Sequence, residues 1–174
     1  AEGSVGAKIQ TMYALGIDME KRNADGAAPV MKQIEEIKAI SDNKEFSKMV
    51  GKIHVESASP FFSFYIGADA KNSMMNLLQF RQGGLSMGNR DYYLLEDETS
   101  AKLREAYKKY VNTLFTLAGY SEEDAKNATE KVISLETEIA KVSVDRNTLR
   151  DVHKNYNKMS VKEFVKKYNF IDWE

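Results

Sequence analysis

The stretch from Phe61 to Tyr93, FFSFYIGADAKNSMMNLLQFRQGGLSMGNRDYY, constrains the fold most, because it is the one long segment without helical periodicity. Apolar and polar side chains alternate through residues 61–67 and again through 74–81, with a polar, turn-compatible sequence at 69–72. Alternation on both sides of a turn is typical of an antiparallel β-hairpin. A two-stranded ribbon is only marginally stable alone, so we expect this hairpin to pack against helices through an aromatic face.

Apolar residues recur at three- and four-residue spacing on both sides of this stretch, which predicts amphipathic helices. The predicted helices cover residues 4–22, a short segment after Pro29, a segment from Asp42 to the Ser57–Pro60 stop, about 100–118, 122–142, and a short segment after Ser160. We therefore expect a mainly α chain: a bundle of about six helices with one antiparallel hairpin, at about 61–67 and 74–81, packed against it. Residues 1–174 are expected to form a single helical domain.

The segment 122–142 has the most regular pattern of these predicted helices. Its predicted core face consists of Ala125, Ala128, Val132, Leu135, Ile139 and Val142. The segment 143–158 is polar and lacks a helical pattern, so we expect it to be irregular.

The charge balance excludes several classes of partner. Lysine and arginine number 25, aspartate and glutamate 26, and the net charge is −1. A chain whose charges are so evenly balanced lacks the positive potential that binds nucleic acids and anionic membrane surfaces. There is no cysteine, which excludes disulfides, thiol nucleophiles and thiolate metal sites. No apolar run approaches the about 20 residues that span a bilayer, and the missing initiator Met indicates a processed or excised chain.

The search for catalytic and metal-ligating residues gives no candidate. Only two histidines occur, His54 and His153. They lie too far apart for the His-Glu-x-x-His motif of zinc hydrolases, so each is predicted to be a surface or half-buried structural residue. Gly83, Gly84 and Gly88 are not followed by Gly-Lys-Ser/Thr, which favours a turn over a phosphate-binding loop.

Other polar and aromatic groups also have structural interpretations. The aromatic run 61–65 resembles base-stacking strands of RNA-binding sheets, but the charge balance favours core packing. Glu136 and Glu138 do not face one another on a helix, which predicts a solvated helix edge. Arg90-Asp91 and Arg150-Asp151 are predicted to form local ion pairs or caps.

A set of motifs follows one order along the chain. They are Gly67–Ser73, Gly84–Leu94, Leu135–Ala140, Arg150-Asp151 with Tyr156–Ser160, and Phe170–Trp173. Together they resemble the neprilysin/endothelin-converting-enzyme family of zinc endopeptidases, peptidase family M13. In that family a zinc motif, a second zinc-ligand motif and a substrate-backbone segment lie well downstream, and all three are absent here. The chain thus resembles an N-terminal fragment of the helical, non-catalytic lobe.

The resemblance implies a zinc metalloendopeptidase as the full-length protein, in which a zinc-activated water attacks a peptide carbonyl. This fragment alone is expected to be inactive, with no catalytic, metal or cofactor-binding residue and with zinc only in the full-length enzyme. It would shape the substrate cavity and restrict access to short peptides. Its implied partners are the catalytic lobe of the same polypeptide and peptide substrates.

Two further expectations accompany this resemblance. Animal members are rich in disulfides, so the lack of cysteine indicates a bacterial member, located outside the cytoplasm in the periplasm or cell envelope. An exposed apolar patch that includes Trp173 is expected where the absent lobe docks. The alternative interpretation is a stand-alone helical protein-interaction module without enzymatic activity.

Overall fold

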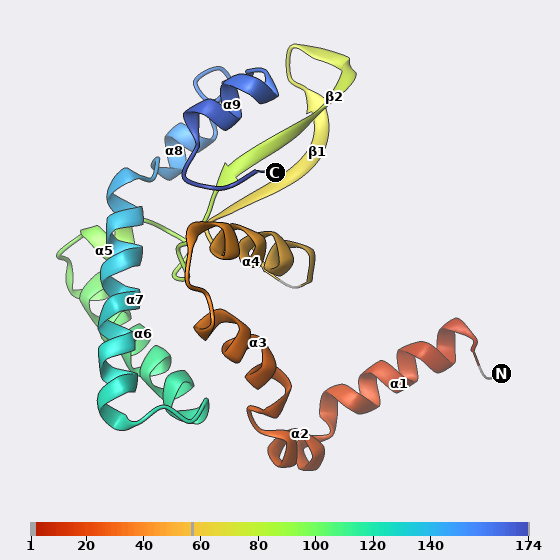
Figure 1. Ribbon diagram of the computed structural model, residues 1–174, viewed down its shortest axis with the longest axis vertical. Helices are drawn as coiled ribbons and strands as arrows, with labels where there is room; N and C mark the ends of the chain where they lie inside the picture. The colour runs from red at the N-terminus through yellow and green to blue at the C-terminus, as the bar shows by residue number, and fades with distance from the viewer. Residues whose placement is uncertain (1–2, 57, 174) are drawn as a thin grey trace. The chain divides into compact units, whose positions relative to one another are not determined.

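A computed structural model of the chain describes residues 3–56 and 58–173. The chain separates into two compact units, residues 1–39 and residues 40–174. The structure confirms a mainly α chain with one antiparallel two-stranded sheet (Figure 1). Within the described residues, no helix combines the length and apolar character needed to cross a membrane.

The first unit contains three helices, α1 (Val5–Ile17), α2 (Met19–Asp25) and α3 (Ala28–Lys38). The single helix predicted over residues 4–22 is divided at Asp18, whose ψ of 81° interrupts the helical backbone. The Asp18 carboxylate then accepts a hydrogen bond from the Lys21 amide at 2.8 Å and so caps α2. The interruption was missed because the apolar spacing continues across it.

The second unit opens with α4 (Asn43–Glu56) and the hairpin of β1 (Phe62–Asp69) and β2 (Asn72–Gln82). The strands are antiparallel, with Phe64 opposite Phe80 and Ile66 opposite Leu78, and the register shifts between Ala68 and Asp69. The predicted hairpin is therefore confirmed, with slightly longer strands than expected.

An aromatic cluster joins one face of the hairpin to helices from both ends of this unit. The Phe80 ring stacks on Phe164 of α9 (Val161–Lys167), with centroids 4.6 Å apart. The Trp173 ring lies 5.0 Å from Phe164 and 5.9 Å from Phe62. The Trp173 indole also donates to the Tyr168 carbonyl at 2.8 Å. Trp173 is thus half-buried in the core, and its predicted place in an exposed patch is wrong.

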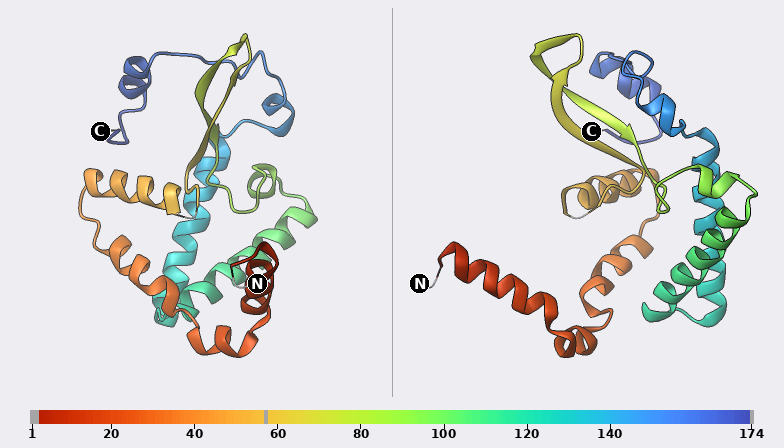
Figure 2. Two further views of the ribbon diagram at one scale, coloured as in Figure 1. Left: turned by 90° about the vertical axis from the view of Figure 1, so that its right-hand side faces the viewer. Right: turned by 180° about the vertical axis from the view of Figure 1, so that it is seen from behind.

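Three helices form the other part of the second unit: α5 (Asp91–Leu94), α6 (Glu98–Leu117) and α7 (Glu122–Val142). The long helices α6 and α7 pack side by side and are joined by a short turn (Figure 2). The side chains of Asp97 and Ser121 cap their N-termini.

The buried face of α7 differs from the predicted one. Leu135 and Val142 are 52% and 83% exposed, although both were predicted in the core. The buried positions of this helix are Ala125, Thr129, Glu136 and Ala140. Small and hydrogen-bonded side chains occupy this face because it carries the polar cluster described below, and periodicity of apolar residues does not report such a face.

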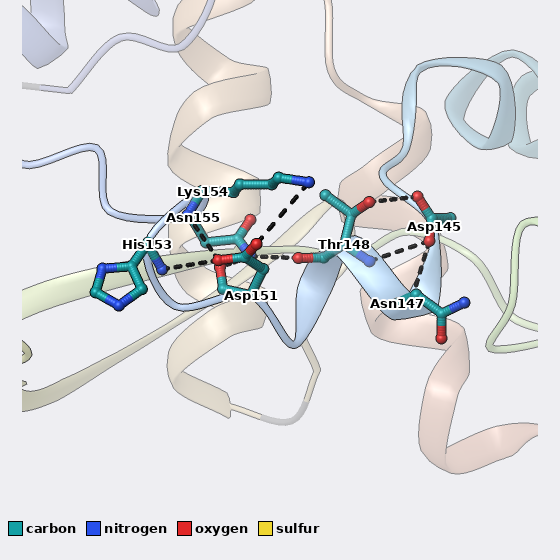
Figure 3. A network of polar contacts seen from close by, with 7 residues as sticks. All are labelled: Asp145, Asn147, Thr148, Asp151, His153, Lys154 and Asn155. Carbon is teal, nitrogen blue, oxygen red and sulfur yellow. Dashed lines mark hydrogen bonds and ion pairs between the residues drawn. The ribbon is translucent and has the colours of Figure 1, made fainter.

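The segment 143–158, predicted to be irregular, contains the short helix α8 (Arg146–Leu149) and a capped turn (Figure 3). The Asp145 carboxylate accepts hydrogen bonds from the Asn147 and Thr148 amides at 2.9 and 3.0 Å. The Asp151 carboxylate accepts from the His153 and Lys154 amides, both at 3.1 Å. Bonds from side chains to the backbone build this segment, so hydrophobic periodicity could not reveal it. The prediction that Asp151 acts as a cap is confirmed.

Gly84 is expected to tolerate no side chain. Its φ is +81°, and an added Cβ would lie 3.3 Å from Ile139 Cδ1 and from the Pro60 carbonyl oxygen. We expect Gly84→Ala to lower the free energy of unfolding by about 1–2 kcal/mol, measured by urea denaturation. Gly88→Ala is the matched control, because Gly88 has a φ of +74° but open space around it. Equal destabilisation by both substitutions would contradict the steric part of this account.

Candidate functional site

Two buried acids, Asp69 and Glu136, each lie at the centre of a polar cluster in the second unit. Their side chains belong to residues that are only 3% and 8% exposed. The hairpin anchor consists of Asp69, Lys71, Tyr156 and Lys158. The Glu136 cluster consists of Ser86, Tyr93, Tyr107 and Glu136.

The hairpin anchor fixes the tip of the hairpin to the segment before α9. Asp69 Oδ1 accepts from the Lys71 amide and from the Tyr156 hydroxyl, both at 2.9 Å. Asp69 Oδ2 lies 2.8 Å from Lys158 Nζ in a salt bridge. The Lys71 ammonium sits 4.2 Å from the centre of the Tyr156 ring. Two motifs nearly 90 positions apart in the sequence therefore meet at one carboxylate.

The anchor shifts the pKa values of Asp69, Tyr156 and Lys158. The hydrogen bond from Lys158, helped by the Lys71 amide, lowers the pKa of Asp69 from 3.8 to about 2. The same bond raises the pKa of Lys158. Burial, with the nearby Asp69 carboxylate, raises the pKa of Tyr156. The carboxylate, the ammonium and the neutral phenol are thus the forms that the folded chain favours.

We expect the anchor to weaken in acid. The Asp69 carboxyl titrates near pH 3.8 in the unfolded chain and near pH 2 in the folded chain. Its contribution is therefore fully present above about pH 4 and is lost as the pH falls towards 2. The difference in unfolding free energy between the wild type and Asp69→Asn should shrink across that range in urea titrations. Glu105→Gln, at an exposed position, should show no such convergence.

The Glu136 cluster joins the loop after β2 to α6 and α7. Ser86 Oγ and the Tyr93 hydroxyl donate to the two Glu136 oxygens, each at 2.6 Å. The Tyr107 hydroxyl donates to Oε1 at 3.1 Å. The Tyr93 oxygen in turn accepts from the Met87 amide at 3.1 Å. Both carboxylate oxygens are therefore occupied by donors from three different parts of the chain.

The tyrosines of this cluster hold their protons firmly. Burial, reinforced by the hydrogen bond to Glu136, raises the pKa of Tyr93. Burial also raises the pKa of Tyr107, and the Glu136 charge adds to this. Both hydroxyls therefore remain donors to the carboxylate at neutral pH and have no tendency to act as bases.

Further side-chain hydrogen bonds from arginine and glutamine join the region between the end of β2 and α5 to neighbouring segments. Arg90 donates to the Ser143 carbonyl at 2.6 Å, and Arg104 donates to the Tyr92 carbonyl at 2.7 Å. Gln82 both donates to the Val144 carbonyl and accepts from its amide. Arg90 thus bonds to the C-terminal end of α7, whereas a local ion pair or cap at Arg90-Asp91 was predicted.

The prediction that Glu136 lies on a solvated helix edge is wrong. Glu138 does lie there, 2.6 Å from Lys141 Nζ and largely exposed. A signal for Glu136 was present in its spacing from the small residues Ala125, Thr129 and Ala140, which share its helix face at intervals of four and seven. The spacing of large apolar residues alone does not reveal this face of the helix.

The histidines do not supply a zinc site. The two His54 ring nitrogens lie 2.8 Å from the carbonyl oxygens of Val50 and Phe62, and the ring stacks near Phe64. His153 is exposed on the Asp151 turn. Across residues 3–56 and 58–173, no three His, Asp or Glu side chains gather in a group that could hold a metal ion. The residues present therefore do not fit a catalytic zinc.

Comparison with solved structures identifies the fold. The *Mycobacterium tuberculosis* zinc metalloprotease Zmp1, in complex with an inhibitor, matches with a TM-score of 0.79 at 24% identity, over 87% of this chain and 23% of that one. PepO from *Lactobacillus rhamnosis* HN001 matches with a TM-score of 0.75 at 19% identity, over 88% of this chain and 24% of that one. At these identities the likeness concerns the fold.

Comparison of sequences identifies the family. Endothelin-converting enzyme 1 of *Mus musculus* is 30% identical over 174 residues, which cover 95% of this chain and 22% of the mouse protein. The human enzyme of the same name gives the same identity and coverage. The chain thus spans about a fifth of the length of these relatives. The model of the family described as Peptidase family M13 matches residues 1–174. By this match over its whole length, and by the motifs that meet at Asp69 and Glu136, the chain belongs to peptidase family M13.

Proposed function

We propose that this chain is the N-terminal, non-catalytic helical portion of a zinc-dependent endopeptidase. In that protein it shapes the substrate cavity and restricts access to short peptides. Support comes from the family match and from relatives named as an endothelin-converting enzyme and a zinc metalloprotease. Residues 1–174 would act as one helical domain, and the zinc would be bound by a catalytic lobe elsewhere in the same polypeptide.

The observation that carries the non-catalytic role is the state of the two buried acids. A general acid or base needs an oxygen that can reach a reacting group. Asp69 instead accepts from the Lys71 amide and from Lys158 Nζ. Glu136 accepts from the hydroxyls of Ser86 and Tyr93. Both acids therefore maintain tertiary structure.

The proposal also includes the kind of organism and the compartment in which the protein occurs. The lack of cysteine favours a bacterial protein of the periplasm or cell envelope over a disulfide-rich animal one. The balanced charge makes peptides, and not nucleic acids, the expected partner class.

Peptide hydrolysis tests the proposal. The longer polypeptide that contains this chain should bind zinc, and a chelator should abolish its cleavage of peptides. The 174-residue chain by itself should neither bind zinc stoichiometrically nor cleave. Chelator-sensitive turnover by the chain alone would contradict the non-catalytic role. A gene that ends near Glu174 would favour the alternative, a stand-alone interaction module.

Restricted access has its own test in a series of substrates of increasing length. We expect kcat/KM of the longer polypeptide to fall at least about tenfold between peptides of about 10 and about 40 residues with the same cleavage sequence. A flat series would refute restricted access while leaving the zinc chemistry untouched.

A further inference from the structure

We propose that His54 forms a pH-sensitive bridge between α4 and the hairpin, which holds the start of β1 most firmly when both ring nitrogens carry a proton. The His54 bridge consists of the His54 ring and the carbonyl oxygens of Val50 and Phe62. It joins the C-terminal part of α4 to the base of the hairpin, which lie next to each other in the second unit (Figure 1). This inference is independent of the proposed function, because it concerns only contacts within this unit.

The geometry of the bridge calls for two donors on one ring. His54 Nδ1 lies 2.8 Å from the Val50 carbonyl oxygen, and His54 Nε2 lies 2.8 Å from the Phe62 carbonyl oxygen. A carbonyl oxygen only accepts hydrogen bonds, and a neutral imidazole has one N–H donor and one unprotonated nitrogen. Either neutral tautomer therefore leaves a nitrogen lone pair facing a carbonyl oxygen, whereas the doubly protonated ring donates to both oxygens.

Two further features of the surroundings favour a positive charge on this ring. His54 lies in the last turn of α4, where the helix dipole stabilises a cation. The centre of its ring lies 4.7 Å from the centre of the Phe62 ring and 5.3 Å from that of the Phe64 ring. Aromatic faces attract a cation at such distances. The ring is half-buried, so the loss of hydration opposes the charge only in part.

The charged side chains of the neighbouring elements are directed elsewhere. On α4, Lys52 and Glu56 stand two positions from the histidine and so do not share its face of the helix. Strand β1 carries no charge before its last residue, and Arg81 of β2 lies on the other face of the hairpin. The Asp172 amide is bonded about two helical turns before the histidine. The carbonyls, the helix end and the aromatic rings therefore determine the charge of the ring.

The bridge should stabilise the folded chain most at acidic pH. An imidazole in an unfolded chain titrates near about pH 6.5. Folding adds two acceptors for its protons, so the contribution is fully present below about pH 6 and is lost as the pH rises towards about 8. The pKa of Asp69 is about 2, and burial raises the pKa values of Tyr93 and Tyr107 from 10.0, so none of these groups titrates in this range.

Urea denaturation at a series of pH values tests the bridge with a matched pair of substitutions. The chain has two histidines, and His153 is exposed. As the pH falls from about 8 to about 5.5, we expect the unfolding equilibrium constant of His54→Gln to rise about tenfold relative to that of the wild type. His153→Gln should keep the wild-type pH dependence. Equal pH dependence of the wild type and His54→Gln would overturn the inference.

Nuclear magnetic resonance of the wild-type chain reads the protonation state directly, and it decides the question even if His54→Gln does not fold. At about pH 7 we expect both ring nitrogens of His54 to carry protons in most molecules, whereas His153 is mostly neutral. The ring signals of Phe62 and Phe64 should shift as His54 loses its second proton. Those of Phe115, which packs on Tyr120, should stay constant. A folded chain in which His54 has one unprotonated nitrogen at this pH would refute the bridge.

Discussion

Replacing Glu136 by alanine is expected to lower the free energy of unfolding by about 3 kcal/mol, the largest effect of any single substitution considered for this chain. The substitution removes the common acceptor of Ser86, Tyr93 and Tyr107. Buried hydroxyls without an acceptor each cost about 1–3 kcal/mol unless water reaches them. Urea denaturation followed by circular dichroism measures the change.

Glu136→Gln separates the loss of hydrogen bonds from the loss of charge. Its amide oxygen still accepts, so we expect a smaller decrease of about 1 kcal/mol. Glu138→Ala, which removes a solvated neighbour two residues away, should change the free energy of unfolding by less than about 0.5 kcal/mol. If Glu136→Ala and Glu138→Ala behaved alike, the structural role of the cluster would be wrong.

Trp173→Ala is the second substitution with a large expected effect. The indole packs against Phe62, Phe80 and Phe164, and donates to the Tyr168 carbonyl. Removing an aromatic core side chain costs about 3–5 kcal/mol, and we expect about 2 kcal/mol here because the ring is half-buried. The substitution also removes the only tryptophan, so circular dichroism and not fluorescence must follow unfolding.

Val142→Ala provides the comparison for Trp173→Ala. Val142 was predicted in the core but is 83% exposed, so its truncation should cost less than about 0.5 kcal/mol. Trp173→Phe should retain most of the packing and lose only the indole hydrogen bond. A Trp173→Ala chain as stable as the wild type would show that residues 170–173 do not pack on the hairpin in solution.

The hairpin and most helices could be predicted because they depend on local signals. Two-residue alternation on both sides of a polar turn defines β1 and β2, and cap residues such as Asp42, Ser121 and Ser160 mark helix starts. The break at Asp18 could not be predicted from apolar spacing, which continues through it. There the decisive interaction is a side chain capping the next helix.

The polar clusters were beyond prediction from spacing because their partners are far apart in the sequence. Asp69 meets Tyr156 and Lys158, and Glu136 meets Ser86 and Tyr93, through contacts that no local period encodes. The motifs that carry the family resemblance contained these residues, but neither cluster was predicted from them. The structure supplies the reason: each cluster joins two motifs.

The closing contacts of the second unit have a consequence for how the unit could be moved between proteins. Asn43 donates to the Phe170 carbonyl at 2.8 Å, and the Asp172 amide donates to Ser47 Oγ at 2.9 Å. The beginning and the end of this unit therefore lie at neighbouring points, although more than 120 residues of sequence separate them. A unit with adjacent ends can be spliced into a surface loop of a host protein with little strain on either. Residues 40–173 thus have the geometry of a transplantable insert, because the two ends of the unit lie close together.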